Sequence, residues 1–146
     1  ILMLGDSGAY LLGFFVGYMI ISSHISNPNI SPYFFISLIW YPCFENLFSI
    51  LRKLNREFSP LKPDSKHLHQ LVFFFLTKKF NLKLILSNNL SSLIICFFNF
   101  LIIYISTLNP SSTIFQIKLI ATSVIFYNAS YMLLFKFYKS NLISKK

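Results

Sequence analysis

Two short polar segments carry residues whose types and spacing suit phosphate chemistry. The first is Gly5-Asp6-Ser7-Gly8, which lies directly before an apolar stretch. An aspartate in that place is typical of a helix N-cap, because its carboxylate accepts hydrogen bonds from the free amides of a first turn. A carboxylate flanked by glycines also suits a hard cation such as Mg²⁺, since a phosphate can then approach the backbone closely. The residues alone leave both interpretations of Asp6 open.

The second segment, residues 59–70 (SPLKPDSKHLHQ), holds His67 and His69 two residues apart. In an extended stretch both imidazoles point to the same side. Such a pair is half of a zinc site, but Zn²⁺ needs three or four ligands and His24 falls on the opposite side of the expected membrane. Beside Lys62 and Lys66, the two histidines suit contacts with phosphate oxygens better. A solvated surface loop is the alternative.

Glu45 is an acid inside an apolar segment. A carboxylate is costly within a membrane, so it is expected to face protein or water and to have a partner. Arg52, two helical turns later, and Asn46 are the nearby candidates. Bracing of a helix end and a part in catalysis are both compatible with this position.

The composition predicts that membrane helices carry these residues. Of 146 residues, 55% are hydrophobic and only 12% are charged, and the mean hydropathy is +0.62. A soluble domain has about 25% charged residues and a disordered chain has low hydrophobicity, so both classes are excluded. Four apolar stretches, at about 9–25, 33–51, 90–108 and 113–135, approach the ~20 residues that a transmembrane helix needs. The predicted fold is an all-α, polytopic membrane helix bundle with about four transmembrane helices in a single domain, residues 1–146.

The basic residues predict the orientation of the bundle. The chain has 13 Lys and Arg against four acids, a net charge of +9, and every basic residue except Lys118 falls in the loop 52–89 or the tail 136–146. The positive-inside rule places that loop and that tail in the cytoplasm. Aromatic residues lie in the spans and are not interleaved with the bases, so no nucleic-acid partner is predicted. Within the loop, residues 69–80 (HQLVFFFLTKKF) predict an interfacial helix along the headgroups, with Lys78 and Lys79 towards water.

Taken together, these motifs resemble those of a known family of membrane enzymes. Residues 4–13 (LGDSGAYLLG) resemble the (F/L)-G-D-x-G-(A/S)-x-x-L-G signature of the polyprenyl-phosphate N-acetylhexosamine-1-phosphate transferases. This is glycosyltransferase family 4, related to phospho-N-acetylmuramoyl-pentapeptide transferase. Residues 40–52, with Pro42, Glu45 and Arg52, resemble a span of that family, and residues 59–69 resemble its S-P-F-x-x-D-R-x-H-(I/L)-H loop. Ser65 and Gln70 depart from the pattern, standing where many members have Arg and His.

The resemblance implies transfer of an N-acetylhexosamine 1-phosphate from a UDP-sugar to polyprenyl (undecaprenyl) phosphate, with release of UMP. It implies that Asp6 holds Mg²⁺, with Mn²⁺ as an alternative, and that catalysis uses Asp6, His67 and His69. It assigns substrate binding to Asp64, Lys66 and Arg56. The implied setting is a bacterial-type plasma membrane, where the enzyme initiates a lipid-linked envelope glycan.

The resemblance covers only the C-terminal half of such an enzyme, without the family's paired aspartates and D-G-x-D-G loop. Because the chain also begins at Ile1, a fragment that lacks an N-terminal half and is inactive alone is expected. An oligomer is compatible with this expectation. The alternative function is a non-catalytic membrane transport or assembly subunit, in which Asp6 is only a cap.

Overall fold

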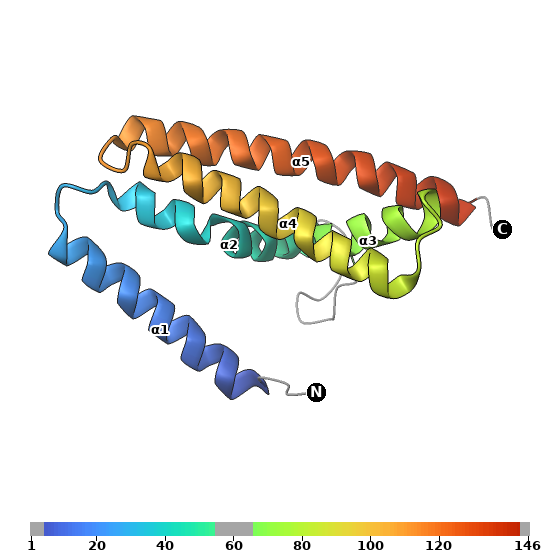
Figure 1. The fold of residues 1–146 in the computed structure, drawn as a ribbon, viewed down its shortest axis with the longest axis horizontal. Coiled ribbons are helices and arrows are strands. Elements are labelled where there is room, and N and C mark those ends of the chain that lie inside the picture. The colour runs from blue at the N-terminus through green and yellow to red at the C-terminus, as the bar shows by residue number, and fades with distance from the viewer. Residues whose placement is uncertain (1–4, 55–65, 144–146) are drawn as a thin grey trace.

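The computed structural model describes residues 5–54 and 66–143, and these residues form helices joined by short turns, with no strand among them (Figure 1). Four helices are long and apolar enough to cross a membrane. A fifth, short helix lies between the second and third of these. The helices are α1 (Gly5–Ser26), α2 (Pro32–Leu54), α3 (Leu68–Lys79), α4 (Leu84–Thr107) and α5 (Thr113–Ile143). The expectation of an all-helical membrane bundle is therefore confirmed at this level.

The short helix α3 is packed into the bundle. One of its faces, made of Leu68, Leu71, Val72 and Leu76, is buried, and it contacts both α4 and α5. Lys78 and Lys79 at its end are exposed, as their charges require. This packing follows because its leucines and valine cover a protein surface. The location of α3 along the headgroups stays a prediction.

The last two long helices extend beyond the apolar stretches read from the sequence. Helix α4 begins at Leu84 rather than near residue 90, and α5 continues to Ile143 rather than ending near 135. Aromatic contacts with α3 explain the extra turns of α5: the ring of Phe74 lies 4.8 Å from Tyr138, and that of Phe75 lies 5.1 Å from Phe137. Residues 136–143, expected as part of a tail, therefore belong to the bundle.

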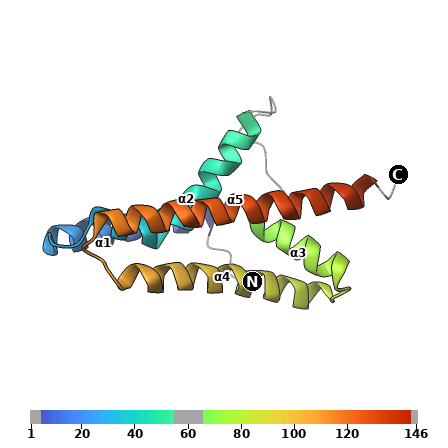
Figure 2. The same ribbon diagram turned by 90° about the horizontal axis from the view of Figure 1, so that it is seen from above.

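Helix α2 contains Pro42 near its middle. A proline inside a helix removes one backbone hydrogen bond and clashes with the preceding turn, which bends the helix. Figure 2 shows the carboxyl-terminal half of α2 leaving the line of its first half and crossing α5. The bend brings the second half of α2, which carries Glu45 and Arg52, against the middle of α5.

A buried polar cluster holds α2, α4 and α5 together near the turn that joins α4 to α5. The hydroxyls of Ser37 and Ser106 lie 2.6 Å apart, and Ser106 donates to Oε1 of Gln116 at 2.7 Å. The Gln116 amide donates to the backbone oxygens of Ser106 and Asn109, each at 2.9 Å. All three side chains are fully buried. In a membrane, where lipid and leucine are equally apolar, such hydrogen bonds help to select helix neighbours.

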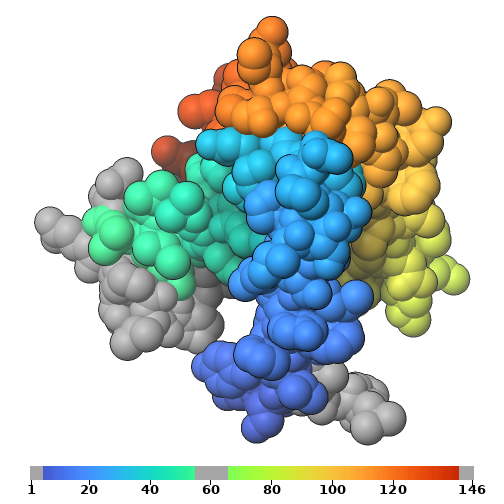
Figure 3. Space-filling model, turned by 90° about the vertical axis from the view of Figure 1, so that its left-hand side faces the viewer, coloured from blue at the N-terminus to red at the C-terminus, as the bar shows by residue number. Residues whose placement is uncertain are grey.

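Helix α1 stands apart from the other helices. It has no buried residue and packs only lightly on α2, where His24 meets Phe35 at 5.6 Å. Figure 3 shows it as a column projecting from the remainder of the molecule. Methyl groups added at Gly13 and Gly17 would meet nothing within 4 Å, so the face that carries these glycines has no described neighbour.

The serine–glutamine cluster predicts a measurable loss of stability in Gln116→Ala. Removal of the amide leaves the Ser106 hydroxyl and two backbone oxygens without this partner, so the unfolding free energy should fall by about 1–2 kcal/mol. SDS titration of the purified chain in detergent micelles measures this change. Thr122→Ala is the control, because Thr122 is exposed and bonds only within its own helix. Equal stabilities of the two variants would contradict the assigned role.

Candidate functional site

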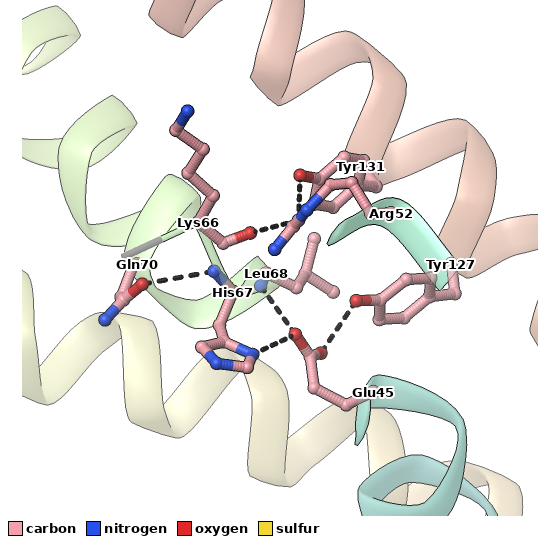
Figure 4. A network of polar contacts seen from close by, with 8 residues as sticks. All are labelled: Glu45, Arg52, Lys66, His67, Leu68, Gln70, Tyr127 and Tyr131. Carbon is pink, nitrogen blue, oxygen red and sulfur yellow. Dashed lines mark hydrogen bonds and ion pairs between the residues drawn. The ribbon is translucent and has the colours of Figure 1, made fainter. Parts of the chain in front are cut away.

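The Glu45 carboxylate is the centre of a network that joins three helices (Figure 4). Its Oε1 accepts hydrogen bonds from the backbone N–H of Leu68 and from Nδ1 of His67, each at 3.0 Å. Its Oε2 accepts from the hydroxyl of Tyr127 at 2.8 Å. Glu45 is 8% exposed and Tyr127 is fully buried. The intramembrane acid therefore has partners, as its burial demands, but they are neither Arg52 nor Asn46.

The spacing of residues on α2 and α5 explains the pairing of these helices. Glu45, Phe48 and Arg52 lie three and four residues apart and so share one helix face, as do Tyr127 and Tyr131. Along this seam Glu45 meets Tyr127 and Arg52 meets Tyr131. The Phe48 ring packs between the two tyrosines, at 5.4 and 4.7 Å.

Arg52 fixes the segment that precedes α3. Its Nη1 donates to the backbone oxygen of Lys66 at 2.7 Å and also to the hydroxyl of Tyr131. The guanidinium lies over the rings of Phe48 and Tyr131, 5.8 and 5.3 Å from their centres. Arg52 and Glu45 thus hold three consecutive residues, 66–68, against the end of α2.

His67 and His69 lie side by side at the start of α3. His67 is the N-cap, with extended backbone angles, and its N–H donates to Oε1 of Gln70 at 3.1 Å. The two imidazole rings are nearly parallel, 11° apart, with centres separated by 5.8 Å. The rings thus lie side by side, but His69 belongs to the first turn of α3 and not to the extended stretch that the prediction assumed. Gln70, a departure from the family pattern, takes part in capping the helix.

The network defines what the imidazoles can do. A carboxylate accepts hydrogen bonds and donates none, so Nδ1 of His67 is the donor to Glu45. Its Nε2 then accepts a proton, or donates one when the ring is charged. Partial loss of solvent, and then the neighbouring His67, lower the pKa of His69, so its ring is neutral at pH 7. A pair with one anchored and one neutral ring suits contacts with phosphate oxygens and proton transfer.

Asp6 lies at the amino end of α1, away from this network. It is exposed, sits in the first helical turn rather than before it, and forms no hydrogen bond or ion pair with any other described residue. Gly5 before it has a φ of +63°, a conformation that favours glycine, and open space surrounds its Cα. In Figure 1 the amino end of α1 lies at about the same level along the bundle as the carboxyl end of α2.

Two expected site residues, Arg56 and Asp64, lie outside the described residues. Lys66 is described, and its backbone oxygen belongs to the network while its side chain leads away from His67 (Figure 4). No three His, Cys, Asp or Glu side chains converge on a metal position within residues 5–54 and 66–143. His67 and His69 therefore have no third described ligand for zinc.

Sequence reasoning missed Tyr127 and Tyr131. The available signal was their spacing of four residues in an otherwise apolar span, opposite an acid that needed a donor. Comparisons with family models, with curated proteins and with solved structures found no match to this chain. The residues and their geometry therefore carry the functional argument.

Tyr127→Phe is predicted to destabilise the chain. It leaves Oε2 of Glu45 buried without this donor, which should lower the unfolding free energy by about 1–3 kcal/mol. The matched control is Tyr104→Phe, because the Tyr104 ring is 57% exposed on α4. Thermal unfolding in detergent, followed by circular dichroism, measures both. A Tyr127→Phe variant as stable as the control would show that Glu45 does not depend on this hydroxyl.

Proposed function

We propose that this chain supplies the acidic motif and the histidine loop of a polyprenyl-phosphate sugar-1-phosphate transferase. The observation that carries the proposal is the histidine pair of that motif, anchored through His67 by the buried Glu45. The site lies among apolar helices at the start of α3, which suits one lipid substrate and one water-soluble substrate. The proposed donor is a UDP-N-acetylhexosamine, and the proposed acceptor is a polyprenyl phosphate.

The surroundings of Asp6 fit a magnesium ion bound together with substrate phosphates. Mg²⁺ commonly takes one or two carboxylates, several waters and phosphate oxygens, rather than a full set of protein ligands. Asp6 offers an exposed carboxylate, and Gly5 leaves room for a phosphate beside the backbone. When bound, such an ion neutralises charge on the diphosphate.

The chain's own polar groups supply the other contacts of the proposed phosphoryl transfer. Phosphoryl transfer depends mainly on positioning and charge stabilisation. His67, oriented by Glu45, binds a phosphate oxygen through Nε2, or takes the proton of the attacking group. His69 binds a further phosphate oxygen. The Lys66 ammonium, which extends away from His67, is proposed to bind another part of the substrate. Arg56 and Asp64 are proposed to complete the substrate contacts.

The first test is Asp6→Asn in the transferase that contains this sequence. The substitution keeps the side-chain volume but removes the charge that holds the metal, so UMP release should fall at least a thousandfold while membrane insertion is unchanged. UMP is measured after incubation with UDP-N-acetylglucosamine, undecaprenyl phosphate and Mg²⁺. Lys118→Gln is the control and should keep full activity, because Lys118 lies near the amino end of α5, away from the Glu45 network. The 146 residues by themselves should release no UMP, since the family's paired aspartates are not among them.

A non-catalytic transport or assembly subunit is the alternative function, in which Glu45 serves only to pair helices. The double variant His67→Gln/His69→Gln separates the two functions in the same assay. Loss of UMP release supports the transferase. Unchanged sugar transfer, or unchanged activity of Asp6→Asn, would contradict it.

We also propose that the α3 end of the bundle faces the cytoplasm of a bacterial-type inner membrane, where UDP-sugars are made. In a background with Cys43→Ala and Cys96→Ala, a cysteine at Ser111 should react with a membrane-impermeant maleimide in intact cells. A cysteine at Ser140 should react only after permeabilisation. Both serines are exposed, at opposite ends of the α4–α5 pair. The reverse labelling pattern would contradict the orientation.

A further inference from the structure

A shallow groove runs between the end of α2 and the last turns of α5. Its volume is about 460 Å³. Its lining combines cations with apolar walls: Arg52, Lys136, Lys139, Phe48, Met132 and Phe135. Asn128 and Tyr131 also line it.

Lys136 and Lys139 lie far along α5 from the end at which α5 is tied to α2. The opposite ends of α2 and α5 are tied together, because Ser31 bonds to Thr113 and to the backbone oxygen of Pro110, each at 3.0 Å. From that level, Lys136 lies 23 residues along α5, which is about 35 Å at 1.5 Å per residue. The hydrocarbon core is about 30 Å thick, so the two lysines are expected near its far boundary.

The charge of the groove is positive and the two lysines have no described counter-ion. Lys136 and Lys139 are exposed, lie three residues apart on one face of α5, and form no ion pair with any residue in 5–54 or 66–143. The described acid Glu45 is hydrogen-bonded to His67, Leu68 and Tyr127 and does not line the groove.

We propose that this groove binds the headgroup of an anionic phospholipid of the surrounding bilayer. The phosphate lies between the two lysines, with the charge of Arg52 nearby, and the first methylenes of an acyl chain lie along Phe48, Met132 and Phe135. The match of cationic rim, apolar wall and membrane depth favours a lipid phosphate over a soluble one, because a soluble anion gains nothing from the wall. This proposal does not depend on the proposed transferase activity.

The test is native mass spectrometry of the purified 146-residue chain with equimolar phosphatidylglycerol and phosphatidylcholine. Each basic residue near an anionic surface contributes about a fivefold preference, so Lys136→Gln/Lys139→Gln should lower the preference for phosphatidylglycerol by about 25-fold. The matched control is Lys78→Gln/Lys79→Gln, which removes two exposed charges at the same end of the bundle but outside the groove. Its preference should change by less than threefold. Lys136→Arg/Lys139→Arg should retain the wild-type preference, and circular dichroism checks that all variants are folded.

Three results would overturn the proposal. An equal loss in the Lys78/Lys79 control would mean diffuse attraction with no site in the groove. Displacement of phosphatidylglycerol by millimolar inorganic phosphate would mean a site for soluble anions. Stoichiometric displacement by undecaprenyl phosphate, with no competition from a second anionic phospholipid, would assign the groove to that lipid instead.

Discussion

The buried carboxylate of Glu45 is the constraint on which the site depends. A charged group in a low-dielectric interior is tolerated only when hydrogen bonds replace the water it has lost. Glu45 receives donors from Tyr127 on α5 and from His67 and Leu68 at the start of α3. One side chain therefore fixes the seam between α2 and α5, caps the first turn of α3 and sets the donor nitrogen of a histidine.

Two separate groups of polar contacts specify which helices are neighbours. Lipid offers no contrast in hydrophobicity between one helix face and another, so hydrogen bonds and close packing must select the partners. The Ser37–Ser106–Gln116 cluster does so near the turn between α4 and α5, and the Glu45 and Arg52 networks do so against the middle of α5. Helix α1 takes part in neither, which agrees with its position apart from the bundle in Figure 1.

Arg52 lies between two surfaces to which we assign different phosphates. On one side it holds the backbone of Lys66, next to the histidine pair of the proposed transferase site. On the other side it lines the groove assigned to a bilayer phospholipid. Arg52 therefore connects the two surfaces, because one side chain lines the groove and holds the segment that precedes the histidine pair.

The sequence by itself determined the class of fold. Its hydropathy required membrane helices, and an acid within a span required a buried partner, because both follow from the cost of placing polar groups in lipid. The tertiary structure decided which partner: Tyr127 lies 82 residues from Glu45, and its selection depends on the bend at Pro42 and on the register of two helices. It also decided that one face of α3 is buried and that α5 continues past Phe135. Both outcomes depend on aromatic contacts between distant segments, which local composition does not reveal.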